Sequence, residues 1–168
     1  MERLIIISRL ISKYNELLHA LKKQSMEENR QKFYDVALSF LGKDVTPRDE
    51  IPDEVACAIT INTIHTKAFG YPIGGGASTY LLYRALLNSP FFVKIDLPEQ
   101  GAVVISPTGY RSKKTKIENG HVGCVGENGI IMSNDSKSGL FLENYTLVSW
   151  RKRFVVEGSY PMYFFRRI

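Results

Sequence analysis

The hydrophobic pattern of this 168-residue chain changes its period near residue 91, and that change restricts the folds open to it. Before this point apolar residues recur at steps of three and four, which is typical of amphipathic helices. After it, short β-rich runs are separated by Pro, Gly and Asn, which indicates strands joined by turns. Helices followed by strands predict an α+β fold whose second half is an antiparallel sheet.

The first predicted helix covers residues 1–24 and is amphipathic. The polar stretch 24–29 is expected to end it, so the chain divides into a helical extension, 1–26, and one globular domain, 27–168. The extension is expected to pack on its own domain or on a neighbouring subunit. Because basic residues flank its apolar stripe, contact with a membrane surface or an assembly partner is the alternative.

Three further helices are expected. One covers about 27–41, and a second covers 54–69, with Asp53 as its N-cap. Ser78 begins the last, which ends at Asn88. Six runs then carry the strand pattern: 91–96, 101–106, 121–126, 129–133, 146–150 and 161–165.

Composition fits a single globular domain, with 44% hydrophobic and 23% charged residues. A net charge of +5 suggests an anionic partner: nucleic acid, phospholipid or a cell-wall polymer. Basic groups at 111–116 and 151–153 are most simply solvated, and no nucleic-acid recognition motif accompanies them, so no nucleic acid is expected. No membrane-spanning segment and no secretory signal peptide are predicted.

The two cysteines differ in setting. Cys57 falls in the first turn of a predicted helix, where free N–H groups and the helix dipole favour a thiolate and should lower the thiol pKa. Cys124 lies within an apolar strand, where a thiol is more often inert. On position alone, Cys57 is the better candidate nucleophile.

Among the three histidines, His121 is the candidate base. His65 is eight residues beyond Cys57 on the same predicted helix and too far along it to touch the thiol. His19 is most simply a surface residue of the first helix. His121 opens a strand just after Gly120, and Gly123, two residues further on, leaves room for a helix end to approach.

A histidine base needs a partner for its second ring nitrogen. The sequence Glu127-Asn128-Gly129 is a hairpin signal that folds the strand after it back along the strand of His121. This places Asn134 or Asp135 near the level of the imidazole. Asn134 gives a Cys-His-Asn arrangement and Asp135 is the second choice.

The order of these residues resembles papain-like peptidoglycan hydrolases of the NlpC and CHAP types. The resemblance covers about residues 30–155 and rests on the segment around Cys57, the stretches 70–82 and 101–106, and GHVGCVGENGIIMSND (120–135). It implies that Cys57 attacks an amide carbonyl, that His121 moves the proton, that Asn134 orients the imidazole and that the Cys57 N–H helps to hold the oxyanion. No metal and no cofactor are expected.

The glycine run 74–76 lacks the lysine of a phosphate loop and lies between two predicted helices. It is either a wall of the substrate groove or a tight interhelical turn. In the first case, the substrate-binding residues are Gly75, Gly76, Ser78, Thr79 and Tyr80.

The resemblance implies a hydrolase acting on bacterial peptidoglycan, either an endopeptidase or an N-acetylmuramoyl-L-alanine amidase. TLVSW (146–150) resembles phage lysins, so a phage endolysin or virion-associated lysin is expected, carried in the virion or held in the host cytoplasm until release to the wall. The alternative is a virion or tail structural protein with an inactive domain of this type. In that case the first helix would bind other virion proteins.

Overall fold

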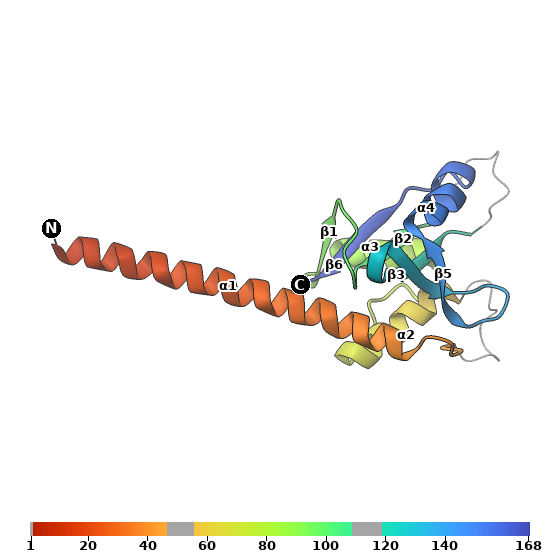
Figure 1. Cartoon of the computed structure of the whole chain (residues 1–168), viewed down its shortest axis with the longest axis horizontal. Helices are drawn as coiled ribbons and strands as arrows, with labels where there is room; N and C mark the ends of the chain where they lie inside the picture. The colour runs from red at the N-terminus through yellow and green to blue at the C-terminus, as the bar shows by residue number, and fades with distance from the viewer. Residues whose placement is uncertain (1, 47–55, 109–118) are drawn as a thin grey trace.

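The computed structural model describes residues 2–46, 56–108 and 119–168 (Figure 1). In these ranges the long helices come before the first strand, and short helical segments lie between some of the later strands. The expected α+β fold, with helices first and an antiparallel sheet second, is confirmed. The elements are α1 Glu2–Ser39, α2 Cys57–Phe69, α3 Thr79–Asn88, β1 Phe92–Ile95, β2 Val103–Ser106, β3 His121–Val125, η2 Glu127–Gly129, β4 Ile130–Asn134, β5 Phe141–Thr146, α4 Leu147–Trp150, η3 Arg151–Glu157 and β6 Tyr163–Arg167.

The six strands form one antiparallel sheet in the order β1-β6-β2-β3-β4-β5. The predicted hairpin joins β3 and β4, with Asn128 at a φ of 52° in its turn and Gly123 opposite Ser133. Strand β6 lies between β1 and β2, so residues Tyr163–Arg167 connect β1 to the rest of the sheet.

Each face of the sheet has its own core. Alternate residues of the central strands, such as Val122, pack against α2, α3 and the end of α1. The residues between them, such as Val104, pack against Trp150 and Phe154, from α4 and η3. This alternation follows from the two-residue period of a strand. It decides which side chains can meet at the site.

Helix α1 is continuous through the stretch 24–29, so the predicted break there is wrong. The stretch is polar, but it contains neither Gly nor Pro and is rich in good helix formers. Gln24 Nε2 also donates to Glu28 Oε1 at 2.8 Å, one helical turn away. A polar stretch that lacks Gly and Pro therefore does not end this helix. It lies where the helix passes from solvent to the globular part of the chain.

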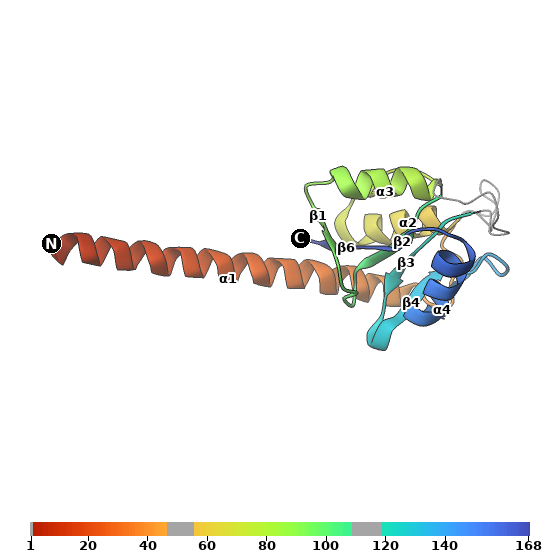
Figure 2. The ribbon, with the colours of Figure 1, turned by 90° about the horizontal axis from the view of Figure 1, so that it is seen from above.

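Only the second half of α1 belongs to the globular unit. Phe33, Tyr34 and Ala37 are buried, and Arg30 Nη1 donates to the Gln100 carbonyl at 2.7 Å. The first half extends away from the other elements in both views (Figures 1 and 2). None of the helices in the described ranges has the length and apolarity needed to cross a bilayer.

The strand expected over 146–150 is also wrong, because Leu147–Trp150 is helix α4. Thr146 and Ser149 form a reciprocal capping box that starts the helix. The fifth strand is the preceding segment, Phe141–Thr146, whose Glu143 and Asn144 weaken the strand pattern.

Helix α2 begins at Cys57, three residues later than expected, and ends at Phe69. Gly70 follows as its C-cap, with a φ of 86° that suits a left-handed conformation. Asp53, its expected N-cap, lies outside the described residues, as does the basic segment 111–116. Helix α3 is as predicted, with the Ser78 side chain accepting from Leu81 N.

Gly75 and Gly76 are both glycines with positive φ, but only one of them lies where a side chain would not fit. Both have positive φ, 80° at Gly75 and 55° at Gly76. A Cβ on Gly75 would overlap the backbone of Leu81 and Leu82, whereas one on Gly76 would meet nothing within 4 Å. We therefore expect Gly75→Ala to lower the free energy of unfolding by about 3 kcal/mol or more and Gly76→Ala by about 1 kcal/mol. Urea unfolding measures both, and equal losses would contradict this packing.

Candidate active site

Cys57 is the first residue of α2 and is 5% exposed. The free N–H groups of a helix start surround it, as the sequence predicts. It lines a cavity of about 210 Å³ together with Ala77, Ser78, Thr79, Thr108, Asn119 and Gly120. A small group that enters this cavity reaches the thiol at the positive end of the helix.

The Cys57 thiol is protonated at neutral pH, contrary to the expected lowering of its pKa. Burial raises the pKa to about 11, while backbone hydrogen bonds from Val122, Ala58 and Cys57 itself act in the opposite sense. Because loss of solvent outweighs the N–H groups, the helix start alone does not produce a thiolate. Burial also raises the pKa of the Cys124 thiol, which lies in the core of the α2 face.

The His121 ring lies among aromatic side chains. It stacks on Phe154 at 5.3 Å between ring centroids, and it contacts Trp150 at 5.2 Å and Tyr145 at 5.8 Å. This enclosure, reinforced by the positive charge of Arg153, lowers the pKa of His121 to about 3 against a weaker opposing effect of Asp135. The imidazole is therefore neutral at pH 7, and its burial makes it a weaker base than a solvated histidine.

Ser133 holds one nitrogen of the imidazole. Its hydroxyl donates to Asn144 Oδ1 at 2.6 Å and lies 2.9 Å from His121 Nε2. A hydroxyl has one proton to donate, so Ser133 Oγ accepts from Nε2–H. The network thus assigns the Nε2–H tautomer, which leaves Nδ1 as the basic nitrogen.

The structure does not bring Asn134 to the imidazole. Gly123 pairs with Ser133, so Ser133 shares a face with His121, while Asn134 points to the α2 face. There its Oδ1 accepts from Thr60 Oγ1 at 3.4 Å. Asp135 is near enough to act on His121 by its charge, but its carboxylate accepts from the N–H and hydroxyl of Ser138.

The Cys57 thiol lies beside the backbone at the start of β3, where His121 is the first residue. The thiol is hydrogen-bonded by the N–H of Val122, the residue after His121. Strand N–H groups point within the plane of the sheet, so the sulfur lies beside β3 and close to the His121 backbone. Within the described part of the chain, no direct hydrogen bond joins Cys57 to His121. Such bonds are often long before substrate binds.

Hydroxyl groups fix the cavity wall beside the thiol. Thr79 and Thr108 share a hydrogen bond at 2.7 Å, and Thr108 Oγ1 accepts from Gly120 N at 3.0 Å. A Cβ on Gly120 would overlap the carbonyl of Ser106, so a side chain there would push the strands apart. This wall therefore connects α3 to the residue that precedes His121.

The glycine run also supports the site. Asn62, on α2, donates to the Gly74 carbonyl at 3.0 Å and accepts from Gly74 N at 2.9 Å, which ties the run to the helix of Cys57. Of the five residues expected to bind substrate, Ser78 and Thr79 line the Cys57 cavity. Gly75 packs against the first turn of α3. Gly76 lies in open space, and Tyr80 lies within 3.5 Å of Arg84 on the exposed side of α3.

Sequence reasoning missed Ser133, Asn144 and Tyr145. The first was within reach, because the hairpin turn fixes a register in which Ser133 faces the same side as His121. The other two belong to β5, which the sequence pattern did not reveal. His65 lies apart from the site, as expected, with Nδ1 2.7 Å from the Tyr71 carbonyl.

The low pKa of His121 gives stability a testable pH dependence. Between pH 3 and 6.5 the unfolded chain binds a proton at this residue that the folded chain does not, so the free energy of unfolding falls as pH falls. The contribution is at most about 1.4 kcal/mol per pH unit.

We expect the stability difference between wild type and His121→Gln to shrink by about 2.5 kcal/mol as pH is lowered from about 7 to about 4.5. Urea unfolding at both pH values measures it. A parallel pH dependence in the two proteins would contradict a buried neutral imidazole.

No protein-family model matches this chain, and no curated protein sequence matches it. Among solved structures, it is similar to a chain in the crystal structure of the type VI native effector–immunity complex Tae3–Tai3 from Ralstonia pickettii. The TM-score is 0.48 at 16% identity, over 82% of this chain and 97% of that one. The expected phage origin finds no support in these comparisons.

Proposed function

We propose that this chain is a cysteine hydrolase that cleaves an amide bond of bacterial peptidoglycan. The observation that carries the proposal is the Cys57 thiol at a helix start, beside the strand of a neutral imidazole whose Nε2 is held by Ser133. Acyl transfer requires a nucleophile, a base and a group that orients the base, and these residues supply all three. Peptidoglycan as the substrate class rests on the sequence resemblance, which includes the segments around both residues.

The reaction begins with both groups neutral. His121 Nδ1 takes the thiol proton as the Cys57 sulfur attacks the amide carbonyl carbon, which avoids forming a buried thiolate beforehand. The carbonyl oxygen gains the negative charge, and the free N–H groups at the start of α2 stabilise it. The imidazolium then gives its proton to the amide nitrogen, the carbon–nitrogen bond breaks, and the amine leaves.

A thioester on Cys57 remains, and water completes the cycle. His121 removes a proton from water as its oxygen attacks the thioester carbonyl. The carbon–sulfur bond breaks, the carboxylic product leaves, and the proton returns to the Cys57 sulfur. Ser133 and Asn144 keep the imidazole in one tautomer through both steps.

Both an endopeptidase and an N-acetylmuramoyl-L-alanine amidase use this chemistry, and the shape of the groove selects the bond. Analysis of the new amino and carboxyl termini in digested wall fragments distinguishes them. New termini within the stem peptide identify an endopeptidase. A free lactyl carboxylate identifies an amidase.

Cys57→Ala should lower peptidoglycan hydrolysis by about a thousandfold or more, because it removes the atom that forms the thioester. Cys124→Ala is the matched control: it replaces a buried cysteine on the same face and should keep activity in the fraction that folds. Turbidity loss of purified wall measures both. Lysis by Cys57→Ala would refute the mechanism. A wild-type protein without activity would favour the alternative of a structural or assembly protein.

Ser133→Ala and Asn134→Ala separate the contact that the structure contains from the one expected by sequence. Loss of Ser133 frees the imidazole to change tautomer and should lower kcat about tenfold or more with little change in KM. Asn134→Ala loses a contact to Thr60 and should mainly lower stability. Kinetics at equal folded concentration measure both, and a larger kcat loss for Asn134→Ala would restore the sequence-based assignment.

A further inference from the structure

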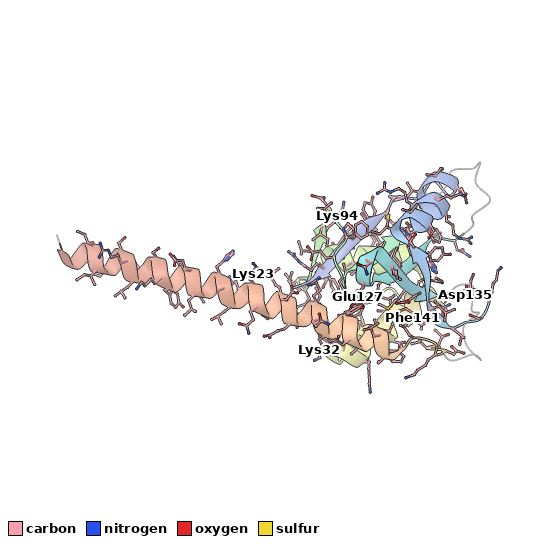
Figure 3. All side chains as sticks on the ribbon, in the orientation of Figure 1. Lys23, Lys32, Lys94, Glu127, Asp135 and Phe141 are labelled. Carbon is pink, nitrogen blue, oxygen red and sulfur yellow. The ribbon has the colours of Figure 1, made fainter. Side chains whose placement is uncertain are left out.

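A row of exposed apolar side chains lies on the first half of α1. Nine large apolar side chains there are between 37% and 62% exposed: Ile5, Ile6, Ile7, Leu10, Ile11, Tyr14, Leu17, Leu18 and Leu21. Figure 3 shows this part of the helix, which includes Lys23, clear of the domain, whereas Lys32 lies where the helix meets it. Monomeric proteins rarely leave such a continuous apolar surface in water.

Seven of these side chains form one stripe. At 100° per residue, the residues from Ile7 to Leu21 with three- and four-residue spacing lie within an arc of about 120°. The exposed stretch 5–21 is about 25 Å long at 1.5 Å per residue. We name this surface the α1 stripe.

The charges around the stripe are mostly positive. From residue 5 to residue 25 the helix carries four basic residues, Arg9, Lys13, Lys22 and Lys23, and one acidic residue, Glu16. Lys13 and Lys22 lie just outside the two edges of the arc. Their long stems can follow an apolar surface while their ammonium groups stay in a polar layer.

A two-stranded coiled coil of two copies fits this pattern poorly. With Ile11 and Leu18 at position a, the seam is flanked by Ser8, Asn15 and Lys22 on one side and by Leu10, Leu17 and Gln24 on the other. No acidic residue faces a basic one across that seam, and two exposed leucines remain outside it.

We propose that the first half of α1 lies on an anionic phospholipid surface, with the α1 stripe in the headgroup region. A wide apolar arc with basic edges and a basic polar face is the pattern of interfacial helices. The helix lies on the bilayer rather than across it, because it is not apolar enough to span. This inference goes beyond the proposed function and does not depend on the activity of Cys57.

The second half of α1 helps the first half to stay helical on a lipid surface. Phe33 and Ala37 anchor the helix in the core, so its first half begins from a turn that is already formed. Binding to lipid then has to order few additional residues into the helix. The globular unit is held beside the membrane by a continuous helix, without a flexible linker.

Flotation of the full-length protein with vesicles tests the proposal. We expect binding to phosphatidylcholine vesicles containing about one third phosphatidylglycerol, weakening with salt, and at least tenfold weaker binding to phosphatidylcholine alone. Lys13→Gln with Lys22→Gln should weaken binding to the anionic vesicles on the order of tenfold.

A matched pair of double variants separates the stripe from the helix. Leu10→Gln with Leu17→Gln should weaken binding at least tenfold. Ser12→Gln with His19→Gln, on the polar face, should leave it within about twofold, and circular dichroism confirms the helix in both. Equal binding to neutral and anionic vesicles would overturn the proposal. Absence of binding, with a dimer in light scattering that the leucine variant dissociates, would overturn it in favour of a second copy.

Discussion

The packing of α2 against the central strands is the interaction on which the rest of the structure depends. Alternate side chains of β3 and β2, such as Val122 and Ile105, form one core with this helix. That contact sets the height at which the helix begins, and so places Cys57 beside the start of β3. The same alternation sends His121 toward Trp150 and Phe154. Strand β3 thus contributes side chains to both cores. Cys57 lies near its first residue on the α2 side, and the His121 side chain points to the other side.

Burial determines the electrostatic state of the site. A helix start and an adjacent histidine are often taken to imply a reactive thiolate. Here the loss of solvent raises the pKa of Cys57 and lowers that of His121, so both groups are neutral at pH 7. The uncharged pair is favoured because separated charges are costly in a low-dielectric site. Proton transfer coupled to bond formation is the chemistry that such a pair supports.

The two halves of helix α1 differ in burial. The second half packs its apolar side chains into the core, and the first half leaves its apolar side chains exposed to water. Its second half contributes Phe33 and Ala37 to the core, while its first half exposes a stripe of leucine and isoleucine. The two halves differ in their surroundings and not in backbone conformation. The polarity of the segment between them predicts a break, but its residues favour helix and the helix continues through it.

The fold class, the hairpin at Asn128, helix α3 and the helical setting of Cys57 follow from the amino-acid sequence, because hydrophobic period, helix caps and turn residues are local properties. The sequence also held the information that Ser133 shares a face with His121, since a hairpin turn fixes register. Only the tertiary structure revealed strand β5, the contact of Ser133 with Asn144 and the aromatic enclosure of His121. The protonation of Cys57 was likewise decided by tertiary burial, because desolvation depends on neighbours distant in sequence that local patterns do not specify.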